Sequence, residues 1–207
     1  MNNNLSAPCS LACKARALLD ATRTVDFLAP LALRIYLAPI FILAGLGKLK
    51  DLDSTAWYFG EMLGLPLPEL MALLAGATEF FGGIALLLGL ATRWFALPLM
   101  ITMIVAAVTA HWSNGWHALP ETTLTVPWEW RMDLIEGAQQ RKEIAMAILR
   151  EHGNYDWLTG TGSFTILKNG IEFAASYFIM LLVLFFNGAG KASFDYVIGR
   201  KFTCSAN

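Results

Sequence analysis

Long apolar runs separated by short polar segments dominate this chain of 207 residues. Four runs approach the length of about 20 residues that a helix needs to cross a bilayer. They lie at about 28–48, 70–90, 94–110 and 164–186. The alternative is a soluble helical core, but four runs of this length in one small chain exceed typical buried helices. The pattern therefore predicts an all-α integral membrane protein, a four-helix transmembrane bundle.

The polar segments predict how the chain is divided. We expect a cytoplasmic N-terminal segment, three spans, an outer loop, a fourth span and a cytoplasmic tail, at 1–27, 28–110, 111–163, 164–187 and 188–207. Within the outer loop, Arg131 to Glu151 has the pattern of a helix with a partly apolar face, and Gly153 is a candidate C-cap. We expect this helix to lie on the membrane surface or to cover the bundle.

Composition supports the membrane assignment and excludes one class of partner. Hydrophobic residues make up 56% of the chain and charged residues only 15%, with a mean hydropathy of +0.51. This balance is unusual for a soluble domain. The net charge of −1 gives no basic signal for nucleic acid, so we expect no nucleic-acid partner.

The distribution of lysine and arginine predicts the orientation. Seven basic residues flank the spans on one side, namely Lys14, Arg16, Arg23, Arg93, Lys191, Arg200 and Lys201. The first connection on the other side holds only Lys48 and Lys50 among acidic residues, and the long 111–163 loop carries less weight. Both termini are therefore expected in the cytoplasm. Cys9, Cys13 and Cys204 would then face a reducing compartment as free thiols.

Charged residues within the apolar runs form the first candidate site. Glu79 lies near the middle of the second run, where a carboxylate costs about 2.5–3.5 kcal/mol without a partner. Arg34 lies at a compatible depth, so we expect the two to pair, and we place Lys48 near the outer surface. The pair could simply hold the helices in register. Alternatively, these three residues form a polar site for a proton, a quinone headgroup, a lipid or an anionic ligand.

The three histidines form the second candidate site. His111, His117 and His152 all lie in the expected outer loop. Imidazole is a common ligand of copper and zinc, so the three could share one metal ion. The alternative is that His111 marks a helix end, while His117 and His152 are solvated polar residues.

Several short motifs resemble the DoxX family of small four-helix membrane proteins. They are Leu33-Arg34, Ile40 to Leu49, Gly64 to Pro68, Glu79 to Gly83, Leu88 to Arg93 and Gly188 to Asp195. Arg93 and Asp195 are further site candidates within them. The 111–163 segment departs from the short family pattern. With Trp128-Glu129-Trp130, the stretch His152 to Gly160 and Asn169 to Phe173, it resembles the HvfX subgroup, which adds Glu172 as a candidate.

The resemblance implies an accessory subunit of a bacterial inner membrane, more than a stand-alone enzyme. The HvfX subgroup is associated with the making of copper-binding ribosomal peptides, so the first hypothesis is maturation, export or membrane handling of such a peptide. The second is a membrane subunit of a quinone-linked thiosulfate or thiol oxidoreductase. The third is a scaffold for a membrane complex. Copper or quinone would be the ligand, and the partners would be the lipid bilayer and other membrane or peptide-maturation proteins.

Overall fold

A computed structural model of the chain describes residues 7–119, 126–165 and 167–203, and within these ranges the regular structure is helical. The α-helices are α1 (Ala7–Thr22), α2 (Leu28–Lys50), α3 (Leu52–Trp57), α4 (Pro68–Leu88), α5 (Thr92–Ala106), α6 (Met132–His152), α7 (Tyr155–Thr159), α8 (Glu172–Asn187) and α9 (Phe194–Thr203). Short 3₁₀ turns are η1 (Arg23–Val25) and η4 (Trp112–Asn114), and π turns are η2 (Tyr58–Met62) and η3 (Ala107–His111).

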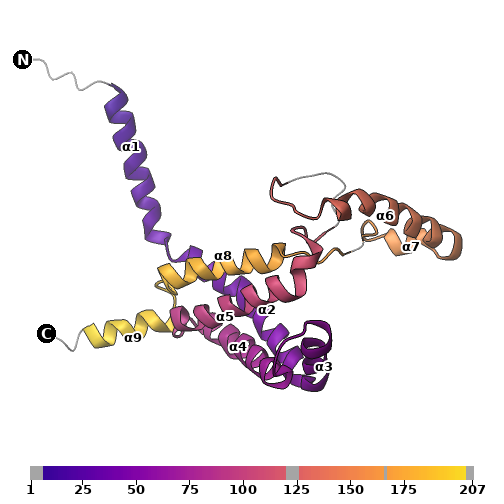
Figure 1. The fold of residues 1–207 in the computed structure, drawn as a ribbon. Coiled ribbons are helices and arrows are strands. Elements are labelled where there is room, and N and C mark those ends of the chain that lie inside the picture. The colour runs from indigo at the N-terminus through magenta and orange to yellow at the C-terminus, as the bar shows by residue number, and fades with distance from the viewer. Residues whose placement is uncertain (1–6, 120–125, 166, 204–207) are drawn as a thin grey trace, which may run out of the picture.

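Four helices make the body of the molecule. Helix α2 packs along α4, α5 packs along α8, and α4 contacts α5 (Figure 1). Large apolar side chains fill the space between them, with Leu37, Phe41, Leu86, Leu99 and Leu181 almost fully buried. The opposite faces of the same helices expose many large apolar side chains, as expected of helices whose outer surface meets lipid.

Three helices are long and apolar enough to cross a membrane: Leu28–Lys50, Pro68–Leu88 and the continuous α5–η3–η4 segment Thr92–Asn114. They correspond to the first three predicted spans, so the chain is an all-α membrane protein. The fourth predicted span is wrong at its start. Helix α8 begins at Glu172, not at 164, and its 16 residues extend about 24 Å. The residues before Glu172 instead bond to the backbone near His117.

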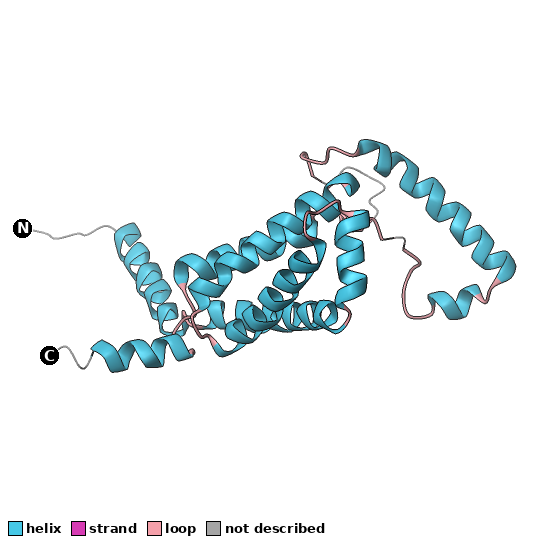
Figure 2. Ribbon diagram, turned by 60° about the horizontal axis from the view of Figure 1, so that its bottom comes forward, coloured by secondary structure: helices cyan, strands magenta, loops and turns pink. Residues whose placement is uncertain are grey.

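The predicted outer helix exists but does not cover the bundle. Helix α6 spans Met132–His152, and the Gly153 N–H closes it by donating to the Leu149 carbonyl at 2.9 Å, in an extended conformation. Figure 2 shows that α6 and the short α7 project beyond the end of the bundle. We call the predicted outer loop, 111–163, together with the residues that lead into α8, the outer segment. Its helices α6 and α7 form a hairpin that lies away from the helices of the core.

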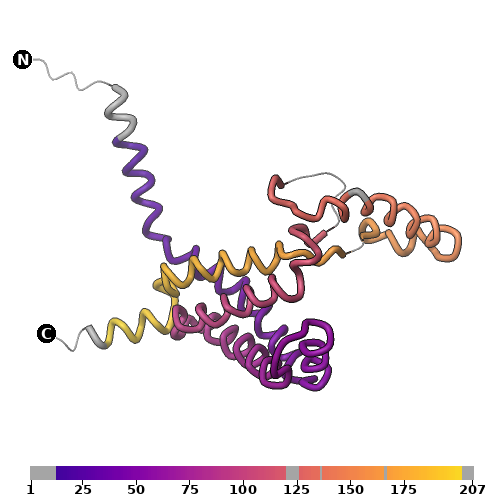
Figure 3. Tube along the Cα trace, in the orientation of Figure 1, coloured from indigo at the N-terminus to yellow at the C-terminus, as the bar shows by residue number. Residues whose placement is uncertain are grey.

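Both ends of the chain leave the bundle on the same side. Helices α1 and α9 extend from the end at which α2 begins and α8 finishes (Figure 3). The hairpin of α6 and α7 lies at the other end. The predicted free thiols are only partly described: Cys13 is exposed, the side chain of Cys9 is not described, and Cys204 lies outside the described residues.

Glycines let α2 and α4 approach until their backbones touch. A Cβ on Gly45 would meet the backbone of Gly76 and Phe80 in α4, and a Cβ on Gly83 would lie 2.8 Å from the Ile42 nitrogen. Small residues favour such close packing in membranes, where dispersion contacts replace the hydrophobic effect between helices. This contact sets the spacing at which the polar residues of α2 and α4 meet.

The glycine contact can be tested with a matched pair of substitutions on α2. Gly45→Ala should lower the free energy of unfolding by about 1–3 kcal/mol, because the added methyl group cannot be accommodated without separating the helices. Gly47→Ala is the control: nothing lies within 4 Å of its Cβ position, so it should be neutral or slightly stabilising. Thermal unfolding in detergent measures both. Equal stability of the two variants would mean that α2 and α4 do not pack in this way.

Candidate functional site

Arg34 is buried, with 2% of its surface exposed, and it joins three segments of the chain. Its guanidinium group donates four hydrogen bonds of 2.7–3.0 Å, to the carbonyl oxygens of Leu86, Leu87, Ala189 and Ala192. The first two close the C-terminus of α4, and the others lie in the turn after α8. The predicted Arg34–Glu79 pair is therefore wrong. Arg34 satisfies backbone oxygens at one end of the bundle instead.

Asp195 and Arg93 close two further helix ends beside Arg34. The Asp195 carboxylate accepts hydrogen bonds from the backbone N–H groups of Ala91 at 2.6 Å and Thr92 at 3.0 Å, where α5 begins. Ala91 has a φ of 48°, a left-handed conformation that is unfavourable for alanine and is held here by this bond. Arg93 donates to the Phe186 carbonyl at 3.0 Å, near the end of α8.

These three residues share one physical role. The last carbonyls of a helix and its first N–H groups have no partner within the helix, and the helix dipole makes the C-terminus negative and the N-terminus positive. Two guanidinium groups meet C-termini and one carboxylate meets an N-terminus, so each charge has the favourable sign. Arg34, Arg93 and Asp195 thus form an end clamp, and we use this name for them below.

Glu79 pairs with Lys48. Lys48 Nζ lies 2.5 Å from Glu79 Oε2, and the two side chains are 27% and 7% exposed. The depth of the Lys48 backbone does not fix the depth of its ammonium group, because the long side chain can run along a neighbouring helix. Gly76 leaves room beside the Lys48 Cβ, so the stem can follow α4 toward Glu79, one turn further along. The predicted polar residues of the bundle therefore belong to two separate places, the end clamp and the Lys48–Glu79 pair.

A carboxylate that was not among the predicted site residues organises the outer segment. Glu129, whose side chain is fully buried, accepts hydrogen bonds from Lys168 Nζ at 2.8 Å and from His117 Nδ1 at 2.8 Å. It also accepts from the backbone N–H groups of Trp116 at 3.2 Å and Arg131 at 2.9 Å. Because an ionised carboxylate can only accept, His117 carries its proton on Nδ1. We call Glu129, His117 and Lys168 the outer cluster.

The electrostatics of the outer cluster favour an ionised Glu129. Burial alone would raise the pKa of its carboxyl group, but the hydrogen bonds from Lys168, the Arg131 backbone, His117 and the Trp116 backbone lower this pKa well below its usual range. Lys168 is itself only 8% exposed, so each charge provides the partner that the other needs. Removal of either charged residue would leave the other buried without a partner, which would destabilise the cluster.

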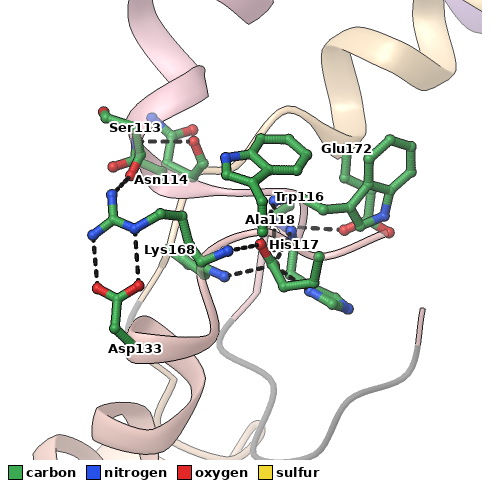
Figure 4. Close-up of polar contacts among 12 residues, drawn as sticks. Ser113, Asn114, Trp116, His117, Ala118, Asp133, Lys168 and Glu172 are labelled. Atoms are coloured by element: carbon green, nitrogen blue, oxygen red, sulfur yellow. Dashed lines mark hydrogen bonds and ion pairs between the residues drawn. The ribbon is translucent and has the colours of Figure 1, made fainter. Parts of the chain in front are cut away.

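Backbone hydrogen bonds join the outer cluster to the start of α8. The N–H groups of Gly170, Ile171 and Glu172 donate to carbonyls of His117, Gly115 and Trp116 at 2.9–3.0 Å. The Glu172 carboxylate accepts from the Ala118 N–H at 2.9 Å. Figure 4 shows Lys168 and Glu172, from the segment that leads into α8, beside the stretch from Trp116 to Ala118. Gly170 is required here, since a Cβ would lie 2.5–2.6 Å from three carbonyl oxygens.

The three predicted histidine ligands do not meet. His111 Nδ1 lies 2.9 Å from the Asn169 carbonyl, His117 faces Glu129, and His152 ends α6 with a side chain that is 71% exposed. Within residues 7–119, 126–165 and 167–203, no group of three or more His, Cys, Asp or Glu is arranged to hold a metal ion. The described donors therefore do not fit a resident copper or zinc site. His111 and His117 are hydrogen-bonding residues of the outer segment.

Sequence reasoning missed Glu129 and Lys168 of the outer cluster for a clear reason. Glu129 and Lys168 are 39 residues apart, and no periodicity connects a loop residue to another loop residue. The Trp128-Glu129-Trp130 motif was a signal that this glutamate is unusual. The flanking tryptophans pack against residues on the other side of the cluster. Trp130 stacks on Trp112 with ring centroids 4.6 Å apart, and Trp128 meets Trp116 edge-on.

Comparisons with known proteins cover part of the chain, and the family match includes α2 to α5. The DoxX family model matches residues 29–112. A Bacillus subtilis (strain 168) protein named "Putative oxidoreductase CatD" is 35% identical over 79 residues, which is 38% of this chain and 57% of that relative. The match thus spans little more than half of the relative. No solved structure matches the chain.

The Lys48–Glu79 pair can be measured with a double-mutant cycle. Lys48→Met and Glu79→Gln should be coupled by about 0.5–3 kcal/mol in unfolding free energy, because the two side chains share one contact. A cycle of Arg34→Met with Glu79→Gln is the control and should give additive losses, since Arg34 bonds to other partners. Unfolding in mixed detergent micelles measures both cycles. Coupling in the Arg34 cycle but not in the Lys48 cycle would show that Arg34, and not Lys48, is the partner of Glu79.

The outer cluster predicts a pH dependence of local stability. The folded pKa of Glu129 is lowered, so its contribution is fully present above the unfolded value of about 4.3 and is lost as the pH falls through the folded pKa. The protection of the Trp116 and Arg131 amides against hydrogen exchange should therefore fall below about pH 4.3. Glu129→Gln should weaken this protection at pH 7 by about 3–5 kcal/mol, because Lys168 would be left buried without its counter-ion.

A surface pair provides the control for this experiment. Asp133, with 62% of its side chain exposed, forms an ion pair with Arg131 in the same segment. Asp133→Asn should change protection little, because exposed pairs contribute little. If Asp133→Asn and Glu129→Gln have the same effect, the burial of Glu129 does not determine the stability of the segment.

Proposed function

Because residues 29–112 match the DoxX family model, we propose that this membrane protein is an accessory subunit whose outer segment binds a partner outside the membrane. The observation that carries the proposal is the outer cluster. A buried carboxylate, a buried lysine and a buried histidine, which contribute to no described metal site, hold the hairpin of α6 and α7 in one position relative to the bundle. Rigid presentation lowers the entropic cost of binding a partner.

The hairpin has the surface that such a partner needs. Ile144 and Ile148 on α6 are each 54% exposed, and Trp157 on α7 is 77% exposed. The hairpin of α6 and α7 that carries them projects beyond the bundle (Figure 2). Tryptophan is enriched among the residues that dominate binding energy at interfaces. An exposed apolar surface on a segment that is firmly attached to the membrane domain supports a docking role.

The finer proposal is that the partner belongs to the maturation, export or membrane handling of a copper-binding ribosomal peptide. It rests on the resemblance of the outer segment to the HvfX subgroup, and the Trp128-Glu129-Trp130 motif of that resemblance lies at the centre of the outer cluster. Copper would travel as cargo of the peptide. The protein's own contribution would be to hold a peptide or a maturation protein at the membrane.

A second candidate is a membrane subunit of a quinone-linked oxidoreductase. Two observations favour it: the name of the Bacillus subtilis relative, and an apolar cavity of about 320 Å³ between α5, η3 and α8. Met103, Phe178 and Trp116 are among its lining residues, and Trp116 also belongs to the outer segment. A quinone ring would lie there among apolar side chains. A quinone absorbance spectrum in the purified protein, bleached by borohydride, would favour this candidate.

The orientation proposed for the protein places both termini in the cytoplasm of a bacterial inner membrane, with the fourth span formed by α8. It is supported by the basic residues at one end of the bundle and by the position of α1 and α9 at that same end (Figure 3). Cys13, which is exposed, should resist a membrane-impermeant maleimide in intact cells and react after lysis. Labelling of Cys13 in intact spheroplasts would reverse the orientation.

The proposed function can be tested by complementation. Deletion of the gene in its host should abolish accumulation of a copper-binding peptide in the medium, measured by mass spectrometry of copper-bound peptide. The wild-type gene should restore it. Glu129→Ala should not, because the hairpin would lose its fixed position even though the bundle remains in the membrane.

Gly47→Ala is the matched control, since it alters the same chain at a position with no neighbours. It should restore the peptide fully. Unchanged peptide in the deletion strain would remove the copper hypothesis. Restoration by Glu129→Ala would show that the outer cluster is not needed for the function.

A further inference from the structure

A second cavity lies at the clamped end of the bundle and belongs to neither candidate function. Its volume is about 770 Å³, and it opens between the start of α2, the start of α5 and the end of α8. Its lining combines apolar side chains, such as Pro30, Trp94 and Val183, with charged ones, such as Arg93 and Lys191. We propose that this cavity binds the headgroup of an anionic phospholipid.

The depth of the cavity fits a headgroup. Two of its walls are the first residues of helices long enough to span the membrane, Leu28–Lys50 and Thr92–Asn114. A cavity at the ends of spanning helices lies at the level of the lipid headgroups. Trp94 supports this level, because it is 81% exposed and tryptophan concentrates at the membrane interface.

Two cations and two carboxylates line the cavity, and both carboxylates already have partners. Asp26 is paired with Lys191 at 2.8 Å, and Asp195 is held by two backbone N–H groups. Arg93 donates to the Phe186 carbonyl, and this is the only hydrogen bond found for it among the described residues. A guanidinium group has five N–H donors, so most of them remain to bind phosphate oxygens. Arg34 adds a further positive charge close to the cavity, because it donates a hydrogen bond to the carbonyl of the lining residue Ala189.

The mixed lining distinguishes a lipid from a free anion. The apolar surface continues from the cavity toward the membrane core at Val183, which is 41% exposed on α8. An acyl chain would follow this surface, while inorganic phosphate would gain nothing from it. Basic pockets between spanning helices are recognised sites for anionic headgroups in general. This proposal does not depend on the partner that the outer segment binds.

The experiment measures the shift in thermal unfolding on adding lipid to the purified protein in detergent. Phosphatidylglycerol should raise the midpoint by several degrees, because a ligand that binds only the folded state stabilises it. Phosphatidylcholine with the same acyl chains, and inorganic phosphate, should raise it far less. Arg93→Gln should weaken the apparent affinity for phosphatidylglycerol on the order of tenfold or more, the effect of losing a charged hydrogen bond.

Matched variants separate binding from folding. Arg141→Gln removes an exposed arginine on α6, away from the cavity, and should leave the lipid shift unchanged. Arg93 also closes α8, so if Arg93→Gln does not fold, Lys191→Gln decides: it lines the cavity on an exposed turn and should reduce the shift. Equal shifts with phosphatidylcholine, equal shifts with inorganic phosphate, or a full phosphatidylglycerol shift in the cavity variants would each overturn the proposal.

Discussion

The guanidinium group of Arg34 is the interaction on which the arrangement of the bundle depends. It is buried within the first spanning helix, yet it bonds to backbone oxygens of two other segments that lie 52 to 158 residues further along the chain. The oxygens of Leu86 and Ala189 are buried in the protein, where an acceptor without a hydrogen bond would be expensive. One charged side chain thereby fixes the end of α4 and the turn after α8 against α2. Arg93 and Asp195 repeat the same principle at the neighbouring helix ends.

At the far end of α2 the constraint is steric. Because Gly45 and Gly76 have no side chains, the backbones of α2 and α4 lie in contact, and the Lys48 stem has room to reach Glu79. The same glycines that determine the packing therefore determine which cation meets the intramembrane carboxylate. The pair neutralises Glu79 without exposing it, since only 7% of its side chain is accessible.

The outer segment uses buried polar groups where the bundle uses apolar packing. Its tryptophans are mostly exposed or paired with one another, so they cannot build a core of their own. Glu129 holds the segment together instead. It accepts hydrogen bonds from side chains and backbone groups that lie before α6 and after α7. The proposed partner-binding role depends on this cluster, because a loop without a fixed position would present its exposed side chains in many orientations. The cavity that we propose for a lipid headgroup lies at the opposite end, so lipid binding and partner binding would use separate surfaces.

The sequence by itself determined the class of the protein, because apolar run length and bilayer thickness are local quantities. It placed the first three spans and the helix after Arg131 within a few residues, and it singled out Arg34, Glu79, Lys48, Arg93 and Asp195 as unusual. Only the tertiary structure decided their partners. Arg34 finds carbonyl oxygens because the ends of α4 and α8 converge on it, and Glu79 finds Lys48 because glycines open a path between them. Likewise Glu172 begins α8, and Lys168 reaches Glu129, because two loops distant in sequence pair their backbones. Such contacts depend on chain crossings that no pattern of polar and apolar positions records.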